Sequence, residues 1–533
     1  MYKIKCNILL LILSLNALIS SDIALVSAGA GHSLLLKTDG TVYSWGANNY
    51  GQLGTGDTDE CYWPTQVRNP TGFGYLNNII DISAGNGFSL ALTSDSIAYA
   101  WGVNNYGQLG NGTTVQSSLP VRITDSTGSS FLDRIRTISA GSFGALALDS
   151  DGYVWSWGSN REGALGIGSS DFDPHPLPQH VLIDGGDFLD NVTKIICGSL
   201  FNLAQRADSS IWAWGANGDG QLGNDTTLSS YYANPVLDST GIASLGGVVT
   251  IAATGTGVFG IMGHSLALDS EGKFWSWGRN FNGQLGDATF VCRDLPTRVR
   301  NSYGGGFFGN AISISAGSEH SLALCEDGSV WAWGNNYYGV IGNNTTSDRN
   351  LPTQVHGVDN IGYLTDIVQI STSNSHNFAI DSEGNLYGWG RNNSGQIGDG
   401  TVIQRNYPVA ITSIPVGLQE SIPLPAESSL WVYPNPFNSA VTIAVEGVGD
   451  GSPVPFEVEI YDVNGRMVEG GTVGAYCIRP FDGSTRLTPT TQEYIWQPDE
   501  SLPSGVYLVR ARVETGSISG ATATSTKRIV YLK

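Results

Sequence analysis

The sequence predicts an all-β protein: a seven-bladed β-propeller followed by a small C-terminal immunoglobulin-like β-sandwich. Three observations lead to this fold class. The motif W-G-x-N-x-x-G-x-[LI]-G occurs seven times, glycine accounts for 70 of the 533 residues, and only 14% of the residues are charged. Abundant glycine disfavours helices, and low charge together with 14 tryptophans disfavours disorder. This composition favours many short strands joined by tight turns.

The first 21 residues have the three-part layout of a secretory signal peptide. Two lysines precede an apolar run at residues 8–19, and Ser20 and Ser21 supply small residues for a cleavage site. The run is too short to span a bilayer comfortably, and no later stretch approaches about 18 uninterrupted apolar residues. We therefore predict a signal peptide at residues 1–21 and no transmembrane segment. The alternative is a buried N-terminal strand.

Seven sequence repeats organise positions 22–413, the predicted propeller. The tryptophan that begins each motif recurs at nearly constant intervals, and only the interval from the fourth copy to the fifth is clearly longer. An asparagine lies three residues after every tryptophan, and a second aromatic residue lies two residues before it. The tryptophans are Trp45, Trp101, Trp157, Trp214, Trp277, Trp333 and Trp389. Such a regular period indicates an array of similar structural units.

Each repeat is expected to form four short antiparallel strands. In the fifth and sixth copies these are HSLALDS, KFWSWG, LPTRV and AISISAG. Period-two alternation places both aromatic side chains of the second segment on one face, and Asp-Gly or Glu-Gly before it favours a tight hairpin. The Leu or Ile of the Gly-x-[LI]-Gly segment is expected to point inward. Four strands repeated radially seven times make a β-propeller.

The phase of the repeats bears on how the ring closes. The array begins with IALVSAG, which matches the fourth segment, and ends with YPVAI, which matches the third. If each blade begins at the HS segment, IALVSAG must complete the seventh blade. We therefore expect closure by strand exchange between the two ends of the array.

The seven copies resemble the repeats of the regulator of chromosome condensation family, whose members fold as seven-bladed propellers. That family usually carries a histidine before the first strand of the unit. The position holds His32, His264, His320 and His376 in four copies, and Phe88, Gly144 and Phe201 in the other three. Because these positions are spread around the ring, we interpret the histidines as structural, stabilising contacts between blades. A ligand-binding or catalytic role is the alternative.

Residues 414–429 leave the repeat pattern and are rich in proline and serine, which is typical of a linker. Alternating segments with Asn-Gly and Ser-Gly turns follow over residues 430–533. They predict a β-sandwich of about seven strands.

This C-terminal region resembles the sorting domain (type A) of the type IX secretion system. The resemblance rests on YPNPFN at 433–438, IYDVNG at 460–465, SGVY at 504–507 and the ending at 527–533. It implies the type IX machinery as a partner, and a secreted or outer-surface location in a Gram-negative bacterium of the Bacteroidota or a related phylum. An accessory sandwich without a sorting role is the alternative.

Composition and motifs limit the chemistry. The net charge of −21 argues against nucleic acid or an anionic lipid surface as a partner, since both favour Lys and Arg. Five cysteines remain after the signal peptide, never in a C-x-x-C pair, so neither a zinc site nor a disulfide framework is indicated and a single bridge stays open. The G-x-G-x-x-G match at 255–260 lies between strands, and Asp149–Gly152 indicates a hairpin turn rather than a calcium loop. We predict no catalytic residue, metal or cofactor, and no enzymatic activity.

The longest interval between motif tryptophans, from Trp214 to Trp277, contains the candidate binding site. Its additional residues fall between Thr250 and His264, in a loop that displays Val258, Phe259, Ile261 and Met262. Function tends to lie on such loops over rigid scaffolds. The alternative is a loop that folds back and buries Phe259.

A second recurring feature is an aromatic residue in the connection that follows the third predicted strand of five copies. These residues are Tyr75, Phe131, Phe188, Phe307 and Tyr363. Because the recurrence is regular, we interpret these rings as packing under a loop rather than as a binding surface.

The predicted function is that of a secreted or cell-surface propeller that binds an unknown protein or glycan as a monomer. Guanine-nucleotide exchange on a small GTPase is one alternative, because the founding member of the family has that activity. A hydrolase or lyase with an unidentified site in the central channel is the other.

Overall fold

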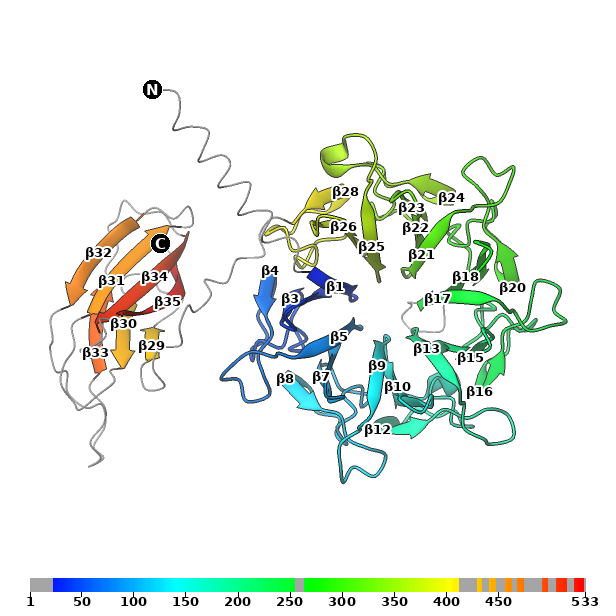
Figure 1. The fold of residues 1–533 in the computed structure, drawn as a ribbon, viewed down its shortest axis with the longest axis horizontal. Coiled ribbons are helices and arrows are strands. Elements are labelled where there is room, and N and C mark those ends of the chain that lie inside the picture. Colours follow the sequence, from blue (N-terminus) through cyan, green and yellow to red (C-terminus); the bar gives the residue numbers. More distant parts are fainter. Residues whose placement is uncertain are drawn as a thin grey trace. The chain divides into compact units, whose positions relative to one another are not determined.

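The computed structural model describes residues 23–254 and 263–411, together with the strands of a second unit after residue 428. The chain divides into the units Met1–Ile414 and Pro415–Lys533. The first unit is a seven-bladed β-propeller, as the repeats predict (Figure 1). Its described helices are two short 3-10 turns, η1 (Arg161–Gly163) and η2 (Val358–Asn360). Within the described residues, no helix is long and apolar enough to cross a membrane.

Each blade is an antiparallel sheet of four consecutive strands, with the first innermost and the fourth at the rim (Figure 1). Blade 1 consists of β1 (Ile23–Ala28), β2 (His32–Lys37), β3 (Val42–Gly46) and β4 (Cys61–Gln66), and blade 2 of β5 (Ile79–Ala84), β6 (Phe88–Thr93), β7 (Ala98–Gly102) and β8 (Ser117–Arg122). Blade 3 consists of β9 (Ile135–Ala140), β10 (Gly144–Asp149), β11 (Val154–Ser159) and β12 (Pro174–His180), and blade 4 of β13 (Val192–Cys197), β14 (Phe201–Arg206), β15 (Ile211–Gly215) and β16 (Ser230–Pro235). Blades 5 to 7 are β17 (Val248–Thr254), β18 (His264–Asp269), β19 (Phe274–Gly278), β20 (Arg293–Arg298); β21 (Ala311–Ala316), β22 (His320–Cys325), β23 (Val330–Gly334), β24 (Arg349–Gln354); and β25 (Ile367–Thr372), β26 (His376–Asp381), β27 (Leu386–Gly390), β28 (Arg405–Ala410).

The expected closure by strand exchange is wrong. β1 pairs with β2 of its own blade, where Val26 lies opposite Leu35, and β25 to β28 complete the seventh blade without it. The ISAG segment is thus the first strand of each blade rather than the last. A repeat of constant period gives the spacing of strands but not the point at which one sheet ends and the next begins. The blade boundary in the structure lies one strand away from the predicted one.

Adjacent blades are joined by the tryptophan of the motif. In all seven blades this side chain is fully buried, and its indole N–H donates to a backbone carbonyl of the preceding blade. The pairs, with nitrogen–oxygen distances of 2.8 to 3.1 Å, are Trp45–Gln396, Trp101–Gln52, Trp157–Gln108, Trp214–Ala164, Trp277–Gln221, Trp333–Gln284 and Trp389–Val340. The first pair links blade 1 to blade 7. The ring therefore closes through the same contact that joins every other pair of neighbours.

The last glycine of the motif makes room for this contact. Gly54 has a φ of +69°, and a Cβ atom there would lie 2.8 Å from Nε1 of Trp101. At the ring closure, Gly398 has a φ of +85°, and a Cβ would lie 2.6 Å from Nε1 of Trp45. Both the positive φ and the close approach require glycine. The residue before each of these glycines is buried, as predicted: Leu53, Leu109, Leu165, Leu222, Leu285, Ile341 and Ile397.

The four repeat histidines also join blades, which confirms their structural role. All four are buried, and Nε2 of each lies within hydrogen-bond distance of a polar side chain in the next blade. The pairs are His32–Ser89 at 2.8 Å, His264–Ser321 at 2.9 Å, His320–Asn377 at 2.7 Å and His376–Ser33 at 2.9 Å. In blade 2, Phe88 takes the same place. A Cβ on Gly85 would meet its ring, just as a Cβ on Gly29 would meet the ring of His32.

The hydrophobic core lies between blades rather than within one sheet. One cluster combines Phe88 and Leu90 of β6 with Ala145 and Ala147 of β10 and Trp157 of β11. The second strand of a blade is covered on both faces by its neighbours, which explains why HSLALD in β18 is buried at every position. Strands buried on both faces carry continuous apolar runs.

The motif asparagine orders the loop that follows the third strand. In blade 2, Nδ2 of Asn104 donates to the carbonyl oxygens of Thr113 at 2.9 Å and Val115 at 3.0 Å, while its Oδ1 accepts from Leu109 N at 2.9 Å. Asn104 is fully buried. Its side chain therefore substitutes for the backbone partners that an irregular loop lacks.

The second unit contains, in its described residues, seven strands in two antiparallel sheets. The sheet orders are β29-β30-β33 and β32-β31-β34-β35. The strands are β29 (Ser429–Tyr433), β30 (Val441–Glu446), β31 (Phe456–Asp462), β32 (Met467–Val473), β33 (Thr491–Trp496), β34 (Gly505–Glu514) and β35 (Thr522–Tyr531). This number agrees with the seven strands expected, and an immunoglobulin-like topology stays a prediction.

Two smaller expectations concern polar turns and thiols. Oδ1 of Asp149 accepts from the backbone N–H groups of Asp151 at 3.0 Å and Tyr153 at 2.9 Å, which is the expected hairpin turn. Four cysteines lie in the described residues and are unpaired: Cys61, Cys197, Cys292 and Cys325. Cys477 lies outside the described residues.

Candidate functional site

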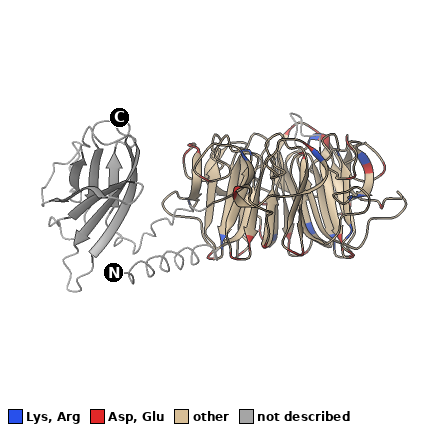
Figure 2. Ribbon diagram, turned by 90° about the horizontal axis from the view of Figure 1, so that it is seen from above, with Lys and Arg blue, Asp and Glu red and all other residues tan. Residues whose placement is uncertain are grey.

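The propeller has two distinct faces, seen edge-on in Figure 2. We call one the loop face, because it carries the turn between the first two strands of each blade and the loop that follows the W-G-x-N motif. The other, the hairpin face, carries the turn between the second and third strands and the connection to the next blade. Charged residues are scattered over both faces, and most of each strand carries none (Figure 2).

The loop face departs from sevenfold symmetry at blades 5 to 7. Two residues after the motif tryptophan, blades 1 to 4 carry small or apolar side chains: Ala47, Val103, Ser159 and Ala216. At the same position blades 5 to 7 carry Arg279, Asn335 and Arg391. Three consecutive blades therefore place a larger polar side chain at this position of the loop face.

Arg279 lies between two carboxylates from the neighbouring blades. Its Nη1 is 3.6 Å from Oδ2 of Asp219, and its Nε is 3.6 Å from Oε1 of Glu319. The side chains of Arg279 and Asp219 are only 14% and 15% exposed. Both separations exceed a normal hydrogen bond, and Oδ2 of Asp219 and Nε of Arg279 are buried without a hydrogen-bond partner. Burial raises the pKa of Asp219, and the neighbouring guanidinium acts in the opposite direction.

Glu319 ties blade 5 to blade 6. Its Oε2 accepts hydrogen bonds from Nδ2 of Asn282 at 2.9 Å and from Nδ2 of Asn335 at 3.3 Å. The backbone N–H of Asn335 also donates to the carbonyl of Glu319 at 2.8 Å. The amide and carboxylate groups are thus held in fixed orientations at the blade junction, which favours directional hydrogen bonding to a ligand.

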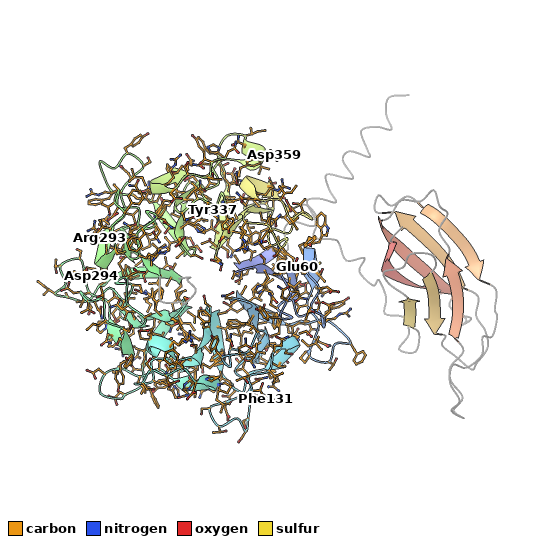
Figure 3. All side chains as sticks on the ribbon, turned by 180° about the vertical axis from the view of Figure 1, so that it is seen from behind. Glu60, Phe131, Arg293, Asp294, Tyr337 and Asp359 are labelled. Atoms are coloured by element: carbon orange, nitrogen blue, oxygen red, sulfur yellow. The ribbon has the colours of Figure 1, made fainter. Side chains whose placement is uncertain are left out.

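Two exposed aromatic rings flank these polar groups. Phe281 and Tyr337 lie four residues after the motif tryptophans of blades 5 and 6, and are 58% and 70% exposed. The Arg279 guanidinium carbon lies 4.8 Å from the Phe281 ring centroid, and Tyr338 packs edge-on against Tyr337 at 4.9 Å. In Figure 3, Phe131 lies at the rim of the propeller, whereas Tyr337 lies further inward. We call Asp219, Arg279, Phe281, Asn282, Glu319, Asn335 and Tyr337 the loop-face cluster.

The predicted binding loop lies outside the described residues. This applies to Val258, Phe259, Ile261 and Met262, and to the G-x-G-x-x-G match. The ends of its connection are described: β17 ends at Thr254 and β18 begins at His264, at the loop face of blade 5. Sequence reasoning missed the loop-face cluster itself. The signal that was visible is the change to Arg, Asn and Arg two residues after the motif tryptophan.

The recurring aromatic residues follow the fourth strand of the observed blades and order the connections between blades. Tyr75 bridges to Arg68 and lies under its guanidinium, 4.9 Å from the ring centroid. Phe131 lies under Arg122 at 3.7 Å in the same way, and Phe188 stacks on His180 at 4.2 Å. These contacts agree with the packing interpretation, although the five rings remain 41% to 57% exposed.

The described residues hold no group of three or more His, Cys, Asp and Glu side chains arranged to bind a metal ion. The loop-face cluster combines instead an apolar ring surface, planar amides, carboxylates and a guanidinium, which are groups that bind and orient a ligand.

Family comparisons agree with both resemblances. The family described as RCC1-like domain matches residues 77–422, and the Regulator of chromosome condensation (RCC1) repeat matches residues 39–92 and 23–52. The Secretion system C-terminal sorting domain matches residues 431–476.

Similar proteins come from plants and animals. The chain is 29% identical over 440 residues to the Ultraviolet-B receptor UVR8 of Arabidopsis thaliana, covering 81% of this chain and 92% of the relative. It is 28% identical over 394 residues to the mouse Secretion-regulating guanine nucleotide exchange factor, covering 70% and 79%. It is 33% identical over 270 residues to the mouse E3 ubiquitin-protein ligase HERC2, covering 50% of this chain but only 5% of that relative.

Solved structures show the same fold. Human WBSCR16 aligns with a TM-score of 0.58 at 20% identity, covering 70% of this chain and 94% of that one. Prp20p of Saccharomyces cerevisiae aligns with a TM-score of 0.52 at 23% identity, covering 66% and 80%.

Proposed function

Because the chain belongs to the RCC1-like domain family, we propose that its propeller is a binding scaffold, exported from the cell, that holds a glycan or protein ligand on the loop face. The single observation that carries this proposal is the loop-face cluster. It places two exposed rings beside a carboxylate fixed by two amides, at a part of the loop face that departs from the repeat. The proposed role is binding alone, without a reaction.

A glycan fits this cluster best. The C–H faces of a sugar stack on aromatic rings, and its hydroxyl groups pair with planar amides, carboxylates and guanidinium groups. Tyr337 and Phe281 supply the rings, and Asn282, Glu319 and Asn335 supply the planar groups.

A glycan array probed with the secreted full chain tests the binding site. Tyr337→Ala and Phe281→Ala are each expected to weaken binding about tenfold or more, because a stacked ring and its buried area contribute roughly 1 to 2 kcal/mol. The matched control is Tyr303→Ala, which removes a ring that is 92% exposed in a connection on the hairpin face. Unchanged binding in both loop-face variants, or an equal loss in the control, would contradict the proposal.

The loop at residues 255–262 is proposed to extend the same site. It joins β17 to β18 on the loop face of blade 5, whose third strand precedes Arg279. Phe259→Ala tested on the same array is expected to weaken binding, with Val258, Ile261 and Met262 as further contacts. Binding equal to that of the unaltered chain would remove the loop from the site and leave the loop-face cluster standing.

Export is proposed to use both ends of the chain. Residues 1–21 would direct transport across the inner membrane, and the C-terminal unit would direct passage of the folded propeller across the outer membrane through the type IX machinery. The match of the sorting domain to residues 431–476 supports this. The expected location is the outer surface or the medium of a bacterium of the Bacteroidota or a related phylum.

Fractionation of the native host tests export. A chain lacking residues 430–533 is expected to accumulate in the periplasm instead of reaching the surface. The control replaces residues 414–429 by a Gly/Ser linker of equal length. Delivery of this variant to the surface is expected to be unchanged, because a linker contributes through its length and flexibility rather than its sequence. Normal surface delivery of the truncated chain would show that residues 430–533 do not direct sorting.

Guanine-nucleotide exchange is the second candidate function. It is favoured by the 28% identical relative, whose name describes that activity. Release of bound GDP from a panel of small GTPases, with and without the chain, distinguishes the two functions.

A further inference from the structure

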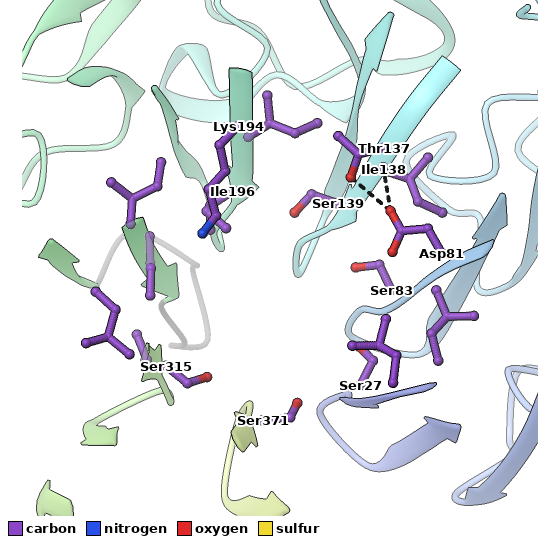
Figure 4. Close-up of a pocket in the computed structure, with 18 of the residues that line it drawn as sticks. Ser27, Asp81, Ser83, Thr137, Ile138, Ser139, Lys194, Ile196, Ser315 and Ser371 are labelled. Carbon is purple, nitrogen blue, oxygen red and sulfur yellow. Dashed lines mark hydrogen bonds between the residues drawn. The ribbon is translucent and has the colours of Figure 1, made fainter. Parts of the chain in front are cut away.

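A cavity of about 640 Å³ lies at the centre of the propeller. It is lined by the innermost strand of every blade, β1, β5, β9, β13, β17, β21 and β25 (Figure 4). Because each strand contributes the same positions, the lining is a series of rings, one for each residue position along the strand.

One of these rings consists mainly of serine hydroxyl groups. The fifth residue of the innermost strand is serine in blades 1, 2, 3, 6 and 7, and Ile196 and Ala252 occupy the position in blades 4 and 5. We call Ser27, Ser83, Ser139, Ser315 and Ser371 the serine ring. In each case Oγ accepts a hydrogen bond from a backbone N–H of the next blade. The distances are 3.0 Å to Ala84, 2.9 Å to Ala140, 2.9 Å to Cys197, 3.2 Å to Thr372 and 3.2 Å to Ala28.

This arrangement leaves a set of donors facing the cavity. A hydroxyl group has one hydrogen to donate in addition to its acceptor lone pairs. The contact with the neighbouring N–H uses the acceptor side, and no acceptor for the hydroxyl hydrogen occurs among the described residues. Figure 4 shows the serine hydroxyl groups around the open centre.

The cavity also holds more positive than negative charge. Lys194 and Arg136 are among its lining residues, and Asp81 is the carboxylate among them. Oδ2 of Asp81 is already occupied, accepting from Thr137 Oγ1 at 2.9 Å and Ile138 N at 3.3 Å (Figure 4). Nζ of Lys194 donates to Thr250 Oγ1 at 2.5 Å. In the described part of the chain Lys194 forms no ion pair.

An unpaired lysine is unexpected in a chain with a net charge of −21. Burial lowers the pKa of Lys194, so the folded chain bears a cost for keeping a cation there. Nζ has three N–H donors and uses one of them on Thr250. An anion beside Nζ would offset that cost, since an opposite charge nearby favours the charged form of a buried group.

We propose that this cavity binds a small oxyanion, a ligand with a carboxylate, phosphate or sulfate group, whose charge pairs with Lys194 and whose oxygens accept hydrogen bonds from the serine ring. The site is separate from the loop-face cluster and does not depend on glycan binding there. The excess of donors over acceptors selects an anion over a neutral sugar, because anion oxygens only accept.

Calorimetric titration of the full chain with citrate, inorganic phosphate and sulfate at low ionic strength tests the site. At least one probe is expected to bind and to raise the melting temperature, since a ligand of the folded state stabilises it. Binding of citrate alone would assign a carboxylate ligand, and binding of phosphate or sulfate would assign a tetrahedral oxyanion. Absence of binding by all three at about 10 mM, the weak end of specific affinities, would overturn the proposal.

Two variants and a control locate the binding. Lys194→Met removes the charge but keeps the length of the side chain, and Lys194→Thr introduces the residue that blades 3 and 5 carry at this position, Thr137 and Thr250. Each variant is expected to lower the affinity for whichever of the three probes binds to the unaltered chain by at least tenfold. Lys273→Met is the control, because Lys273 pairs with Glu271 on a surface hairpin. An equal loss in the control, or unchanged affinity in both Lys194 variants, would overturn the site.

Discussion

Lowering the pH from about 7 to about 4.5 is expected to unfold the propeller, with the loss of stability beginning near pH 6.5. The cause is the set of histidines that join blades. Burial lowers the pKa of His32, His264 and His376 from 6.5 to about 3 and that of His320 to about 4. Nδ1 of the first three is buried without a hydrogen-bond partner, so a proton added there would have no acceptor.

Stability falls with falling pH because the unfolded chain binds protons at these histidines more readily than the folded chain does. The unfolded chain takes up a proton at each of these histidines below about pH 6.5, whereas the folded chain stays neutral until about pH 3 to 4. The folded state is thus at full stability above pH 6.5 and loses about 1.4 kcal/mol per histidine for each pH unit below it. Four histidines give about 5.5 kcal/mol per pH unit, against a total free energy of unfolding of roughly 5 to 15 kcal/mol for a typical domain. Calorimetric melting between pH 7.5 and 4.5 measures this loss.

A variant that copies a neighbouring blade isolates the histidine contribution. His32→Phe combined with Ser89→Ala reproduces the Phe88 and Ala145 pair found one blade further on. It is expected to remove about a quarter of the pH dependence of the free energy of unfolding. The contribution of the carboxyl groups cancels in the comparison because they are common to both proteins. The control is His356→Gln, since the contact of His356 with Asn360 is solvent-exposed. A pH dependence identical to that of the unaltered chain would rule out the buried histidines as the cause.

Trp45→Ala is expected to lower the free energy of unfolding by about 3 to 5 kcal/mol, as much as Trp157→Ala does. Both side chains are fully buried and donate to the preceding blade, Trp45 at 2.9 Å and Trp157 at 2.8 Å. Trp45 also packs edge-on against Phe378 of blade 7 at 5.7 Å. Urea denaturation of the two variants measures the losses. A much smaller loss for Trp45→Ala would contradict closure of the ring through this contact.

Trp45→Phe separates the hydrogen bond from the packing. It keeps an aromatic ring in the site but removes the donor, and the carbonyl of Gln396 still accepts from Ser33 Oγ at 2.8 Å. The expected loss is therefore smaller, about 1 to 3 kcal/mol. A loss equal to that of Trp45→Ala would assign the whole effect to the N–H group.

Much of the propeller could be predicted because a residue that recurs at one phase of a repeat meets the same environment in every copy. The buried Leu and Ile of the motif and the histidine contacts between blades followed in this way. The blade boundary did not follow. β1 pairs with β2 rather than completing the blade of β26, and both arrangements have the same period and the same burial pattern.

The sites were harder to predict because their residues come from different blades. Arg279 and Glu319 belong to different repeats and meet only because consecutive blades lie side by side. The serine ring is visible in the sequence as a serine that recurs in the first strand of five blades. Its hydroxyl groups face one cavity only because the seven innermost strands surround a common axis. Departures from a repeat, such as Arg279 and Lys194, are the signal that sequence alone offers for such sites.

The continuity of each blade has a consequence for how such chains evolve. Every sheet of the propeller comes from one uninterrupted stretch of the chain, a single repeat long, and the junction between blades 7 and 1 uses the same tryptophan contact as the others. A duplication or deletion of one repeat in the gene would add or remove a whole blade without dividing a sheet. A circularly permuted chain that starts at any other blade would form the same seven junctions.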